Sequence, residues 1–533
     1  MHAERRPPRY SLGRVRSQDP PPSRRSARAA LPRGLVVVVA VGVAVGVAAG
    51  VVAAPAPARA DLGRNGDPIQ TSDYTLDLYE GPTLAGARVI GLGGAYAPIA
   101  EGVAGYAYNP AAVAIRLPWS VSWFDWEVDA GLTLPSSITG TDFDNNGDQG
   151  YTNSADIFLT AGFGLQFGGF GVGGAGDLHR YRIESRAEGS EGDRLYVNVA
   201  RSIVVGGYAF RGGEIILGLG AGGHYIWLTR PTGQDDTEQE IASVYGPVVQ
   251  AGVLWAPAWL PLRAGLAVRY SPPEASVPEG VDPTGDDYIS EGYYLPRTLS
   301  LGTEIQGGVA FQLFRPLNFR WVNPHDEDSA ARRAARFIAE ARARRRSEAE
   351  RRLAAARAAG KDEQALEHLE QQIAAEQDRA ERDEAAQLQA AKRADRARRL
   401  RPYRTMPRDK LLVTAAVKVT APVRNGVGLE SFLEQRVERS GAGWSISPRL
   451  GVESEILPNW LVVRAGSYFE PTRFLDNEEV HGRVHGTGGL DVHVPLATDV
   501  LGLLDDPITF RVGGAVDAAS RYFGWSVSAG IWR

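Results

Sequence analysis

The sequence contains no cysteine among its 533 residues. Without a thiol, the chain can form neither a disulfide framework nor a thiolate-based catalytic or metal site. The absence is also compatible with export through an oxidising compartment, where stray thiols would mispair. Thiol chemistry is therefore excluded from whatever this protein does.

An excess of basic residues is also missing, since the formal net charge of the whole chain is -5. The first 60 residues hold ten arginines and two acidic residues, so their removal would leave 48 basic and 61 acidic residues. The remaining chain would then carry a net charge of about −13. This acidic balance argues against nucleic acid as a partner.

The chain has one long apolar run, and it lies near the N-terminus. A basic stretch at 24–33 precedes the run at 35–54, and the small residues of 58–60 supply a cleavage site. A run of about 20 residues could instead stay in the bilayer as a permanent anchor. Pro55 and Pro57 break the helix directly before the cleavage site, which favours a removable export signal over residues 1–60.

In place of helical periodicity, the sequence shows a period of two. In the segment 508–518, for example, apolar residues occupy alternate positions: Ile508, Phe510, Val512 and Val516. A period of two indicates a strand with one apolar and one polar face. Repeated along some 400 residues, this pattern predicts an all-β fold, a closed transmembrane barrel of the outer-membrane type that is apolar outside and polar inside.

From Pro118 onward the pattern predicts fourteen antiparallel strands, eight within 118–324 and six within 403–533. Connections alternate between tight turns, such as Gly168-Gly169, and long polar stretches, such as 133–154. Short periplasmic turns and long external loops are usual in such barrels, so we expect both chain termini on the periplasmic side. The strands are expected at 119–132, 155–168, 170–186, 194–210, 214–230, 243–257, 262–273, 293–314, 409–421, 444–457, 460–470, 483–494, 508–518 and 521–533.

Residues 325–402 interrupt the strands with a composition dominated by Ala, Arg, Glu and Gln, which predicts a long, solvated coiled coil. Both ends must return to adjacent strands about 5 Å apart, whereas a single helix would be roughly 110 Å long. We therefore predict two antiparallel periplasmic helices, at 328–358 and 362–400, that turn at Gly360. Two interpretations stay open: a docking arm for a periplasmic protein, or a solvated insertion without a partner.

Residues 61–117 lack barrel periodicity and are rich in small side chains. Glycines at 91, 93 and 94 permit close backbone approach, and Asn109-Pro110 predicts a turn followed by a short helical start. The Gly-x-Gly-Gly run lacks both the strand–helix context and the lysine of a phosphate-binding loop. The sequence therefore predicts that this segment is a compact unit that fits into a narrow space.

Three stretches of this segment carry a family resemblance: Gly86-Ala87-Arg88, Gly91-Leu92-Gly93-Gly94-Ala95 and Asn109-Pro110-Ala111. Placed just before the first strand of a barrel, they resemble the N-terminal hatch of the FadL-type outer-membrane transporters of hydrophobic compounds. The same motif occurs in the related PorV-like proteins. The resemblance covers nearly all of the chain after residue 60 except 325–402.

The resemblance implies a monomeric barrel in the outer membrane of a Gram-negative bacterium, with residues 61–117 as its plug. It implies passive uptake of hydrophobic molecules such as long-chain fatty acids, with the hatch as the gate. A PorV-like scaffold or shuttle that engages periplasmic or secreted partners is the alternative function. The residues expected to set hatch conformation and packing are Gly93, Gly94, Asn109, Pro110 and Ala111.

The resemblance also implies a lateral exit where the third strand is kinked. In this chain that strand contains Gly173, Gly174 and Gly176. Such glycine density suits a bend or bulge, but it equally suits a tightly curved barrel wall. Both interpretations stay open at this point.

No cluster of acid, base and nucleophile emerges, so we expect neither an enzyme nor a cofactor. Arg449, Arg464 and Arg511 point inward by strand parity, where they would pair with lumen carboxylates or bind a fatty-acid carboxylate. His485, Asp491 and His493 share the inward face of one strand. Ordinary lumen polarity is favoured for these three residues over a metal site.

The first external loop contains Asp142, Asp144, Asn146 and Asp148, spaced like the ligands of a calcium-binding loop. Gly147 stands at the sixth place, as in such loops, but the twelfth place holds Asn153 instead of glutamate. A structural Ca²⁺ site and an Asx-rich turn are the two interpretations.

Overall fold

The computed structural model describes residues 62–532 except 79–85, 119, 136–140, 144, 148–156, 185–193, 233–236, 273, 276–286, 291–292, 326–328, 475–479 and 497–507. The export signal expected at 1–60 lies outside the described residues. No helix among the described residues is long and apolar enough to cross a membrane.

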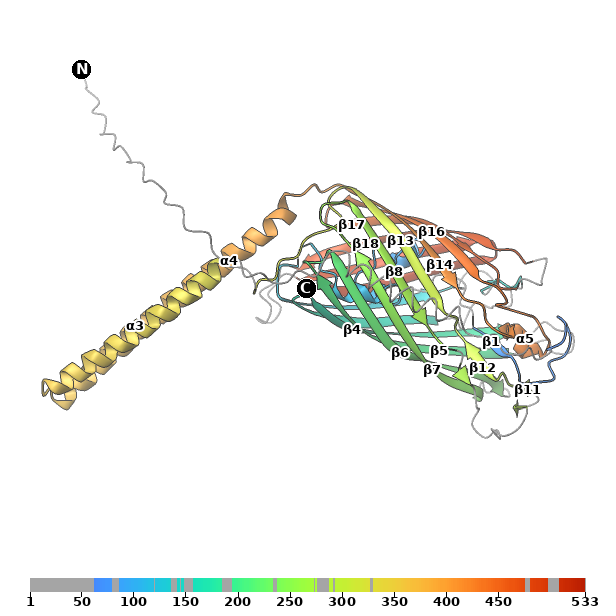
Figure 1. Cartoon of the computed structure of the whole chain (residues 1–533), viewed down its shortest axis with the longest axis horizontal. Helices are drawn as coiled ribbons and strands as arrows, with labels where there is room; N and C mark the ends of the chain where they lie inside the picture. Colours follow the sequence, from blue (N-terminus) through green and yellow to red (C-terminus); the bar gives the residue numbers. More distant parts are fainter. Residues whose placement is uncertain are drawn as a thin grey trace, which may run out of the picture.

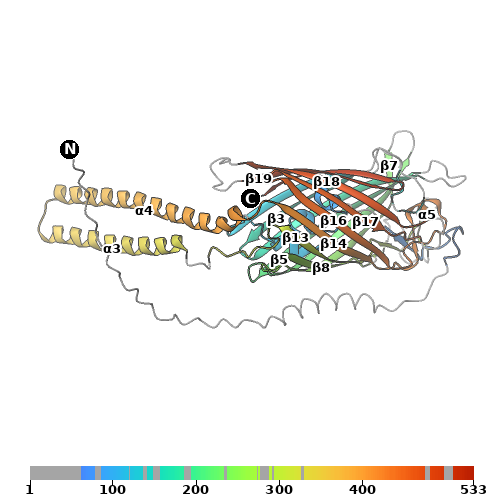
Figure 2. The same cartoon turned by 90° about the horizontal axis from the view of Figure 1, so that it is seen from above.

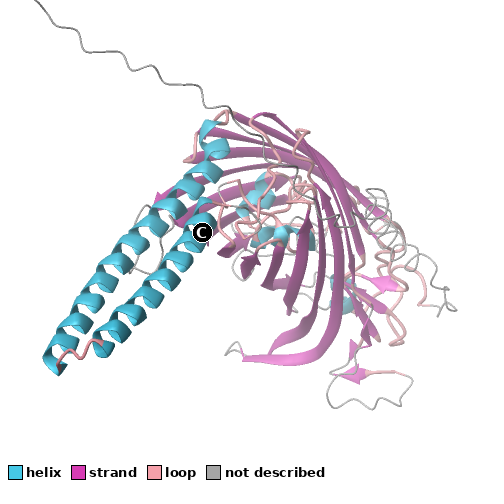
Figure 3. Ribbon diagram, turned by 60° about the vertical axis from the view of Figure 1, so that its left-hand side comes forward, coloured by secondary structure: helices cyan, strands magenta, loops and turns pink. Residues whose placement is uncertain are grey.

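Fourteen strands close into a single barrel, in which every neighbouring pair is antiparallel (Figures 1 and 3). The predicted fold class is therefore confirmed. In wall order the strands are β13 (Glu304–Phe314), β14 (Lys410–Thr420), β16 (Ser445–Leu457), β17 (Leu461–Glu470), β18 (Arg483–Leu496), β19 (Ile508–Ala519), β20 (Tyr522–Trp532), β2 (Phe124–Leu134), β3 (Ile157–Phe167), β4 (Phe170–Glu184), β5 (Arg194–Phe210), β6 (Ile215–Thr232), β7 (Thr237–Trp255) and β8 (Leu262–Tyr270).

The outer face of the barrel is apolar. On β5, Val204 and Tyr208 are exposed, whereas Val197 and Val199 on the other parity are fully buried. Exposed large apolar side chains recur on the strands all around the wall. A soluble monomer rarely carries so extensive an apolar surface, and hydrocarbon would cover it favourably by about 25 cal/mol per Å².

The segment 293–314, predicted as one strand, is in fact broken. Gly302 has φ +70, a left-handed conformation that takes the chain out of the extended region. Only β13 joins the wall, while β11 (Tyr293–Tyr294) pairs with β10 (Ile289–Ser290). The short strand β12 (Thr298–Ser300) pairs instead with β9 (Glu274–Ala275) and, in parallel, with β1 (Thr75–Asp77), which in turn pairs with β15 (Gly426–Val427).

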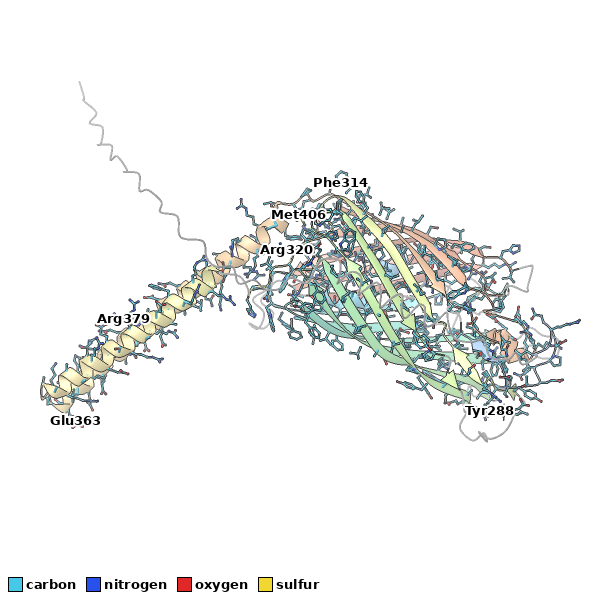
Figure 4. The ribbon with its side chains drawn as sticks, viewed as in Figure 1. Tyr288, Phe314, Arg320, Glu363, Arg379 and Met406 are labelled. Carbon is cyan, nitrogen blue, oxygen red and sulfur yellow. The ribbon has the colours of Figure 1, made fainter. Side chains whose placement is uncertain are left out.

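The two ends of the barrel are occupied by different elements (Figures 1 and 2). The C-terminus and a long helical pair lie at one end, the hairpin end. The other end, the cap end, holds β1, β12 and helix α5 (Leu429–Glu434). Figure 4 shows the same division, with Phe314 and Met406 at the hairpin end and Tyr288 at the cap end.

The start of the described chain was predicted at the same barrel end as the C-terminus, and this is wrong. The segment before β2 begins at the cap end and runs through the lumen to reach the hairpin end, where β2 starts. Strand parity fixes where the first wall strand begins, but it says nothing about the path of the chain before that strand.

The insertion forms two antiparallel helices, α3 (Ala330–Ala358) and α4 (Glu363–Thr405), that project from the barrel (Figure 2). Gly360 has φ +68 and ends the first helix as predicted. The helices contact each other through few apolar side chains: Ile338, Ala356 and Ile373 are buried. Polar side chains must therefore supply much of the attraction between them.

Two buried carboxylates join the helices. Glu384, only 6% exposed, accepts a hydrogen bond from Arg342 Nε at 2.7 Å and another from Arg345. These two hydrogen bonds hold the pKa of Glu384 below its usual value. Asp395 accepts from the backbone N–H groups of Ala330 and Ala331 at 3.0 and 2.7 Å, at the N-terminus of α3, where the helix dipole favours a negative charge.

We expect Glu384→Gln to loosen the helical pair, because a neutral amide replaces the carboxylate that binds both arginines. In the wild type, the stabilisation is complete above the ordinary glutamate pKa of about 4.3 and is lost as pH falls through the lower pKa of the folded state. Spin labels at Ala343→Cys and Ala386→Cys, in this otherwise cysteine-free chain, report the separation of the helices. An unchanged distance distribution in the Gln variant, and in the wild type at acid pH, would contradict this account.

Candidate functional site

A segment of the chain crosses and blocks the barrel lumen. This hatch, residues 86–115, comprises helix α2 (Ala87–Gly91) and the 3-10 helices η1 (Val103–Gly105) and η2 (Pro110–Ala114). Helix α2 contacts β17 to β20, whereas η2 contacts β3 to β7 on the other side. Apolar hatch residues such as Val89, Leu92 and Tyr106 are fully buried. The hatch therefore spans the lumen from wall to wall.

Glycines allow the hatch backbone to lie directly on the wall. A Cβ added to Gly466 would collide with the backbone of Leu92 and Gly93, and one added to Gly218 would collide with Ala111 N. On the hatch side, Gly93 has φ +59, and a Cβ there would lie 2.8 Å from Ser467 N. Only glycine satisfies both the positive φ and the close approach.

The hatch residues singled out by sequence lie at these wall contacts, in two groups on opposite sides of the lumen. Gly94, with φ +68, follows Gly93 at the β17 side. Asn109, completely buried, caps η2 by accepting from Ala111 N at 3.1 Å, and Pro110 occupies the first helical position. The Asn109 amide also donates to Val253 O of β7 at 3.1 Å, so it ties η2 to the wall.

Of the three arginines proposed to bind a carboxylate, two are already paired within the lumen. Arg464 donates to Glu453 at 2.6 Å and to Asp491 at 2.7 Å, and Arg511 pairs with Asp129. These ion pairs correspond to the interpretation in which inward charges satisfy one another.

Arg449 differs from the other two arginines. Its guanidinium donates to Ser447 Oγ at 3.3 Å and to the carbonyl oxygen of hatch residue Gly94 at 3.4 Å. It forms no ion pair with any carboxylate among the described residues. It is therefore the one member of the predicted set with charge available near the hatch.

The two histidines of β18 lie in different surroundings. His485 is fully buried, and its two ring nitrogens lie 2.8 Å from Asp517 and 2.7 Å from Glu470. Asp491 forms its ion pair with Arg464, and His493 Nε2 lies 4.0 Å from Asp491 Oδ2. Within the part of the chain that is described, no three His, Cys, Asp or Glu side chains are placed to hold a metal ion.

The first external loop is organised by Asp142. Its two carboxylate oxygens accept from Asn146 N and Gly147 N, each at 3.1 Å. These bonds reach four and five residues along the chain, so they close the loop around the Asp142 carboxylate, and both interpretations of the loop stay predictions. Asp144 and Asp148, the other expected calcium ligands, lie outside the described residues.

The glycines of β4 do not mark a gap in the wall. β4 pairs with β3 from Phe170 to Arg180 and with β5 from Phe170 to Glu184, in both cases without a register shift. A Cβ on Gly173 would lie 2.8 Å from the ring of hatch residue Tyr106, and one on Gly171 would collide with Val113. The continuous pairing corresponds to the interpretation as a curved barrel wall. Gly171 and Gly173 allow the close approach of the hatch, whereas a Cβ on Gly174 or Gly176 would meet only atoms of the wall.

Two cavities lie on opposite sides of the hatch. The upper cavity, toward the cap end, has a volume of about 150 Å³ and is bounded by Val103 and Tyr108 of the hatch, Leu78, Leu301 and Arg449. The mouth cavity, at the hairpin end, has a volume of about 500 Å³ and is lined by the hatch, the wall and the lower part of α4. The hatch separates these two spaces.

One side of the cap half of the lumen, formed by β4, β5 and β6, is apolar, which strand periodicity did not predict. Ile183, Val197 and Ile226 point inward from β4, β5 and β6 and are fully buried with Leu76 and Leu78 of the β1 region. The available signal was local loss of alternation, as in Ile226-Trp227-Leu228, where apolar residues occupy both faces of a strand.

The β1 region is fixed by a buried ion pair, which was not predicted either. Arg473, 1% exposed, donates from Nε to Asp77 Oδ2 at 2.7 Å and from Nη2 to Oδ1 at 3.3 Å. Such a two-point geometry is specific as well as strong. No linear motif could indicate it, because the partners lie 396 residues apart.

Fold and site together define a closed β-barrel with an internal plug. No family model and no curated protein matches the chain. Similar solved structures include the CymD monoaromatic hydrocarbon channel (8% identity, TM-score 0.42, 85% of this chain and 97% of that chain). A second is the toluene transporter TbuX of Ralstonia pickettii (9% identity, TM-score 0.40, 85% of this chain and 98% of that chain). A third is a FadL homologue of Pseudomonas aeruginosa (9% identity, TM-score 0.42, 88% of this chain and 99% of that chain). The strand pairing itself defines the architecture of the barrel.

We expect Gly252→Ala to displace the hatch, because the added Cβ would lie 2.8 Å from Pro110 Cδ and collide with Asn109 Oδ1. The matched control is Gly206→Ala, since a Cβ there meets nothing within 4 Å. Ion conductance across planar bilayers should rise for Gly252→Ala and stay at the wild-type level for the control. Equal conductance of the two variants would show that this contact does not hold the plug.

Proposed function

We propose that this protein is a FadL-type outer-membrane transporter that admits hydrophobic molecules passively, with residues 86–115 as its gate. The apolar outer face suits a lipid bilayer, and the plugged lumen suits a gated path. No nucleotide-binding motif is visible in the sequence, so movement would follow the concentration gradient. Gly93, Gly94, Asn109, Pro110 and Ala111 would set the closed position of the gate.

The observation that carries this proposal is the apolar inner wall that β4, β5 and β6 form in the cap half of the lumen. Channels for polar solutes have polar interiors filled with water. Here Ile183, Val197 and Ile226 instead form an apolar inner wall against Leu76 and Leu78. A hydrophobic molecule that replaced the β1 region would exchange one apolar contact for another, at little cost in free energy.

The upper cavity fits the next step of such a path. Its volume of about 150 Å³ is sufficient for a molecule of the size of benzene. Apolar side chains line part of it, and charged side chains, among them Arg449 and the paired Glu304 and Lys418, line the rest. A molecule the size of a long-chain fatty acid would fit only if the apolar cluster above also parted.

A PorV-like scaffold is the alternative function, and the projecting hairpin is the observation that favours it. Helices of 29 and 43 residues extend well beyond the mouth that their base adjoins (Figure 2). Deletion of residues 329–405 separates the two functions. Retained uptake with loss of a defined complex would support the scaffold.

We expect Asp77→Asn to speed the uptake of a hydrophobic probe, because it leaves Arg473 buried without its counter-ion. Loss of one partner of a buried pair typically costs about 3–5 kcal/mol, which would release the β1 region from the cap. Fluorescence of N-phenylnaphthylamine on entry into proteoliposomes measures the rate. The control is Asp67→Asn, an exposed acidic residue of the same segment. Identical rates in both variants would mean that the β1 region does not restrict entry.

A further inference from the structure

The mouth cavity is built by three separate parts of the chain. Ile115 and Arg116 of the hatch exit form one side, and Leu317 and Trp321, which follow β13, form another. The third side is the base of α4. The hairpin is therefore not only an appendage, because it completes a cavity of about 500 Å³ directly beneath the gate.

One face of α4 is turned toward this cavity. Arg396, Leu400, Tyr403 and Arg404 all line it, and their spacing of four, three and one residues places them on one side of a helix. Tyr403 fixes this face by donating from its hydroxyl to Asn459 Oδ1 in the β16–β17 turn at 3.0 Å. The helix base thus has a defined seat on the barrel rim.

The base of α4 carries an excess of positive charge. Residues 385–405 contain seven basic residues and one acidic residue. Cations on the other sides of the cavity are matched: Arg116 pairs with Asp125, and Arg315 pairs with Glu455 at 2.7 Å. Arg404 is exposed and forms no ion pair or hydrogen bond with any described residue. Among the described residues, Arg404 is thus a cation at the cavity without a counter-ion.

We propose that the mouth cavity binds an amphipathic carboxylate, with its charged group on Arg404 and its hydrocarbon part against Leu400, Leu317 and Trp321. The volume lies within the 300–1,000 Å³ typical of small-molecule sites. A guanidinium binds a carboxylate through two parallel hydrogen bonds. This proposal rests on the proposed function and narrows the range of transported molecules, because the mouth cavity would select acids over neutral hydrocarbons at the step of release.

The test uses the full-length protein in nanodiscs of zwitterionic lipid. The probes are 11-(dansylamino)undecanoic acid and its methyl ester, which share a hydrocarbon chain but differ in charge. Arg404→Gln should weaken binding of the acid about fivefold, near the upper limit for an exposed ion pair, and leave the ester unchanged. Arg404→Lys should restore most of the affinity for the acid. Leu400→Asn should weaken both probes.

The control variant is Arg346→Gln, an exposed arginine of the same hairpin that lies away from the cavity. Three outcomes would overturn the proposal: wild-type affinity of Arg404→Gln for the acid, equal losses for acid and ester, or an equal loss in Arg346→Gln. Transport is scored separately, through entry of neutral toluene into proteoliposomes. If toluene does not enter but the affinity for the acid depends on Arg404, the transport proposal is wrong and the proposed binding site stands.

Discussion

The direct packing of the hatch backbone on glycines of the wall is the constraint on which the rest of the lumen depends. Side chains can adjust to a shifted neighbour, but a backbone lying on Gly218 and Gly466 has no such freedom. The hatch therefore fits in one position, and that position divides the lumen into the upper and mouth cavities. The two cavities are lined by different parts of the chain because the hatch lies between them.

Charges within the lumen are arranged to cancel rather than to attract a ligand. Arg464 lies between Glu453 and Asp491, and Glu453 also binds Arg88 of the hatch. Breaking such pairs leaves a buried charge without compensation, so they add to the resistance of the hatch to movement. Arg404, which we propose to bind a carboxylate, lies outside this network.

Much of the fold could be predicted from the sequence, because a period of two and turn glycines act locally. The wall strands and the helical turn at Gly360 are of this kind. Features set by distant partners could not be predicted. The two interpretations of the β4 glycines could not be separated, because Tyr106 and Val113 of the hatch, which lie beside Gly173 and Gly171, are remote in sequence. The break at Gly302 depends likewise on β1, which draws β12 out of the wall.

Function is harder to predict than fold in such a protein for a related physical reason. A strand with apolar residues on both faces loses the alternation that identifies it. Here that loss marks the apolar inner wall near the cap end, as at Ile226-Trp227-Leu228. An apolar path that ends in water needs a final position where the molecule is still partly covered. In the proposed path, the mouth cavity, closed on one side by α4, would provide that cover. The insertion least like a barrel thus helps to form a cavity of the barrel itself.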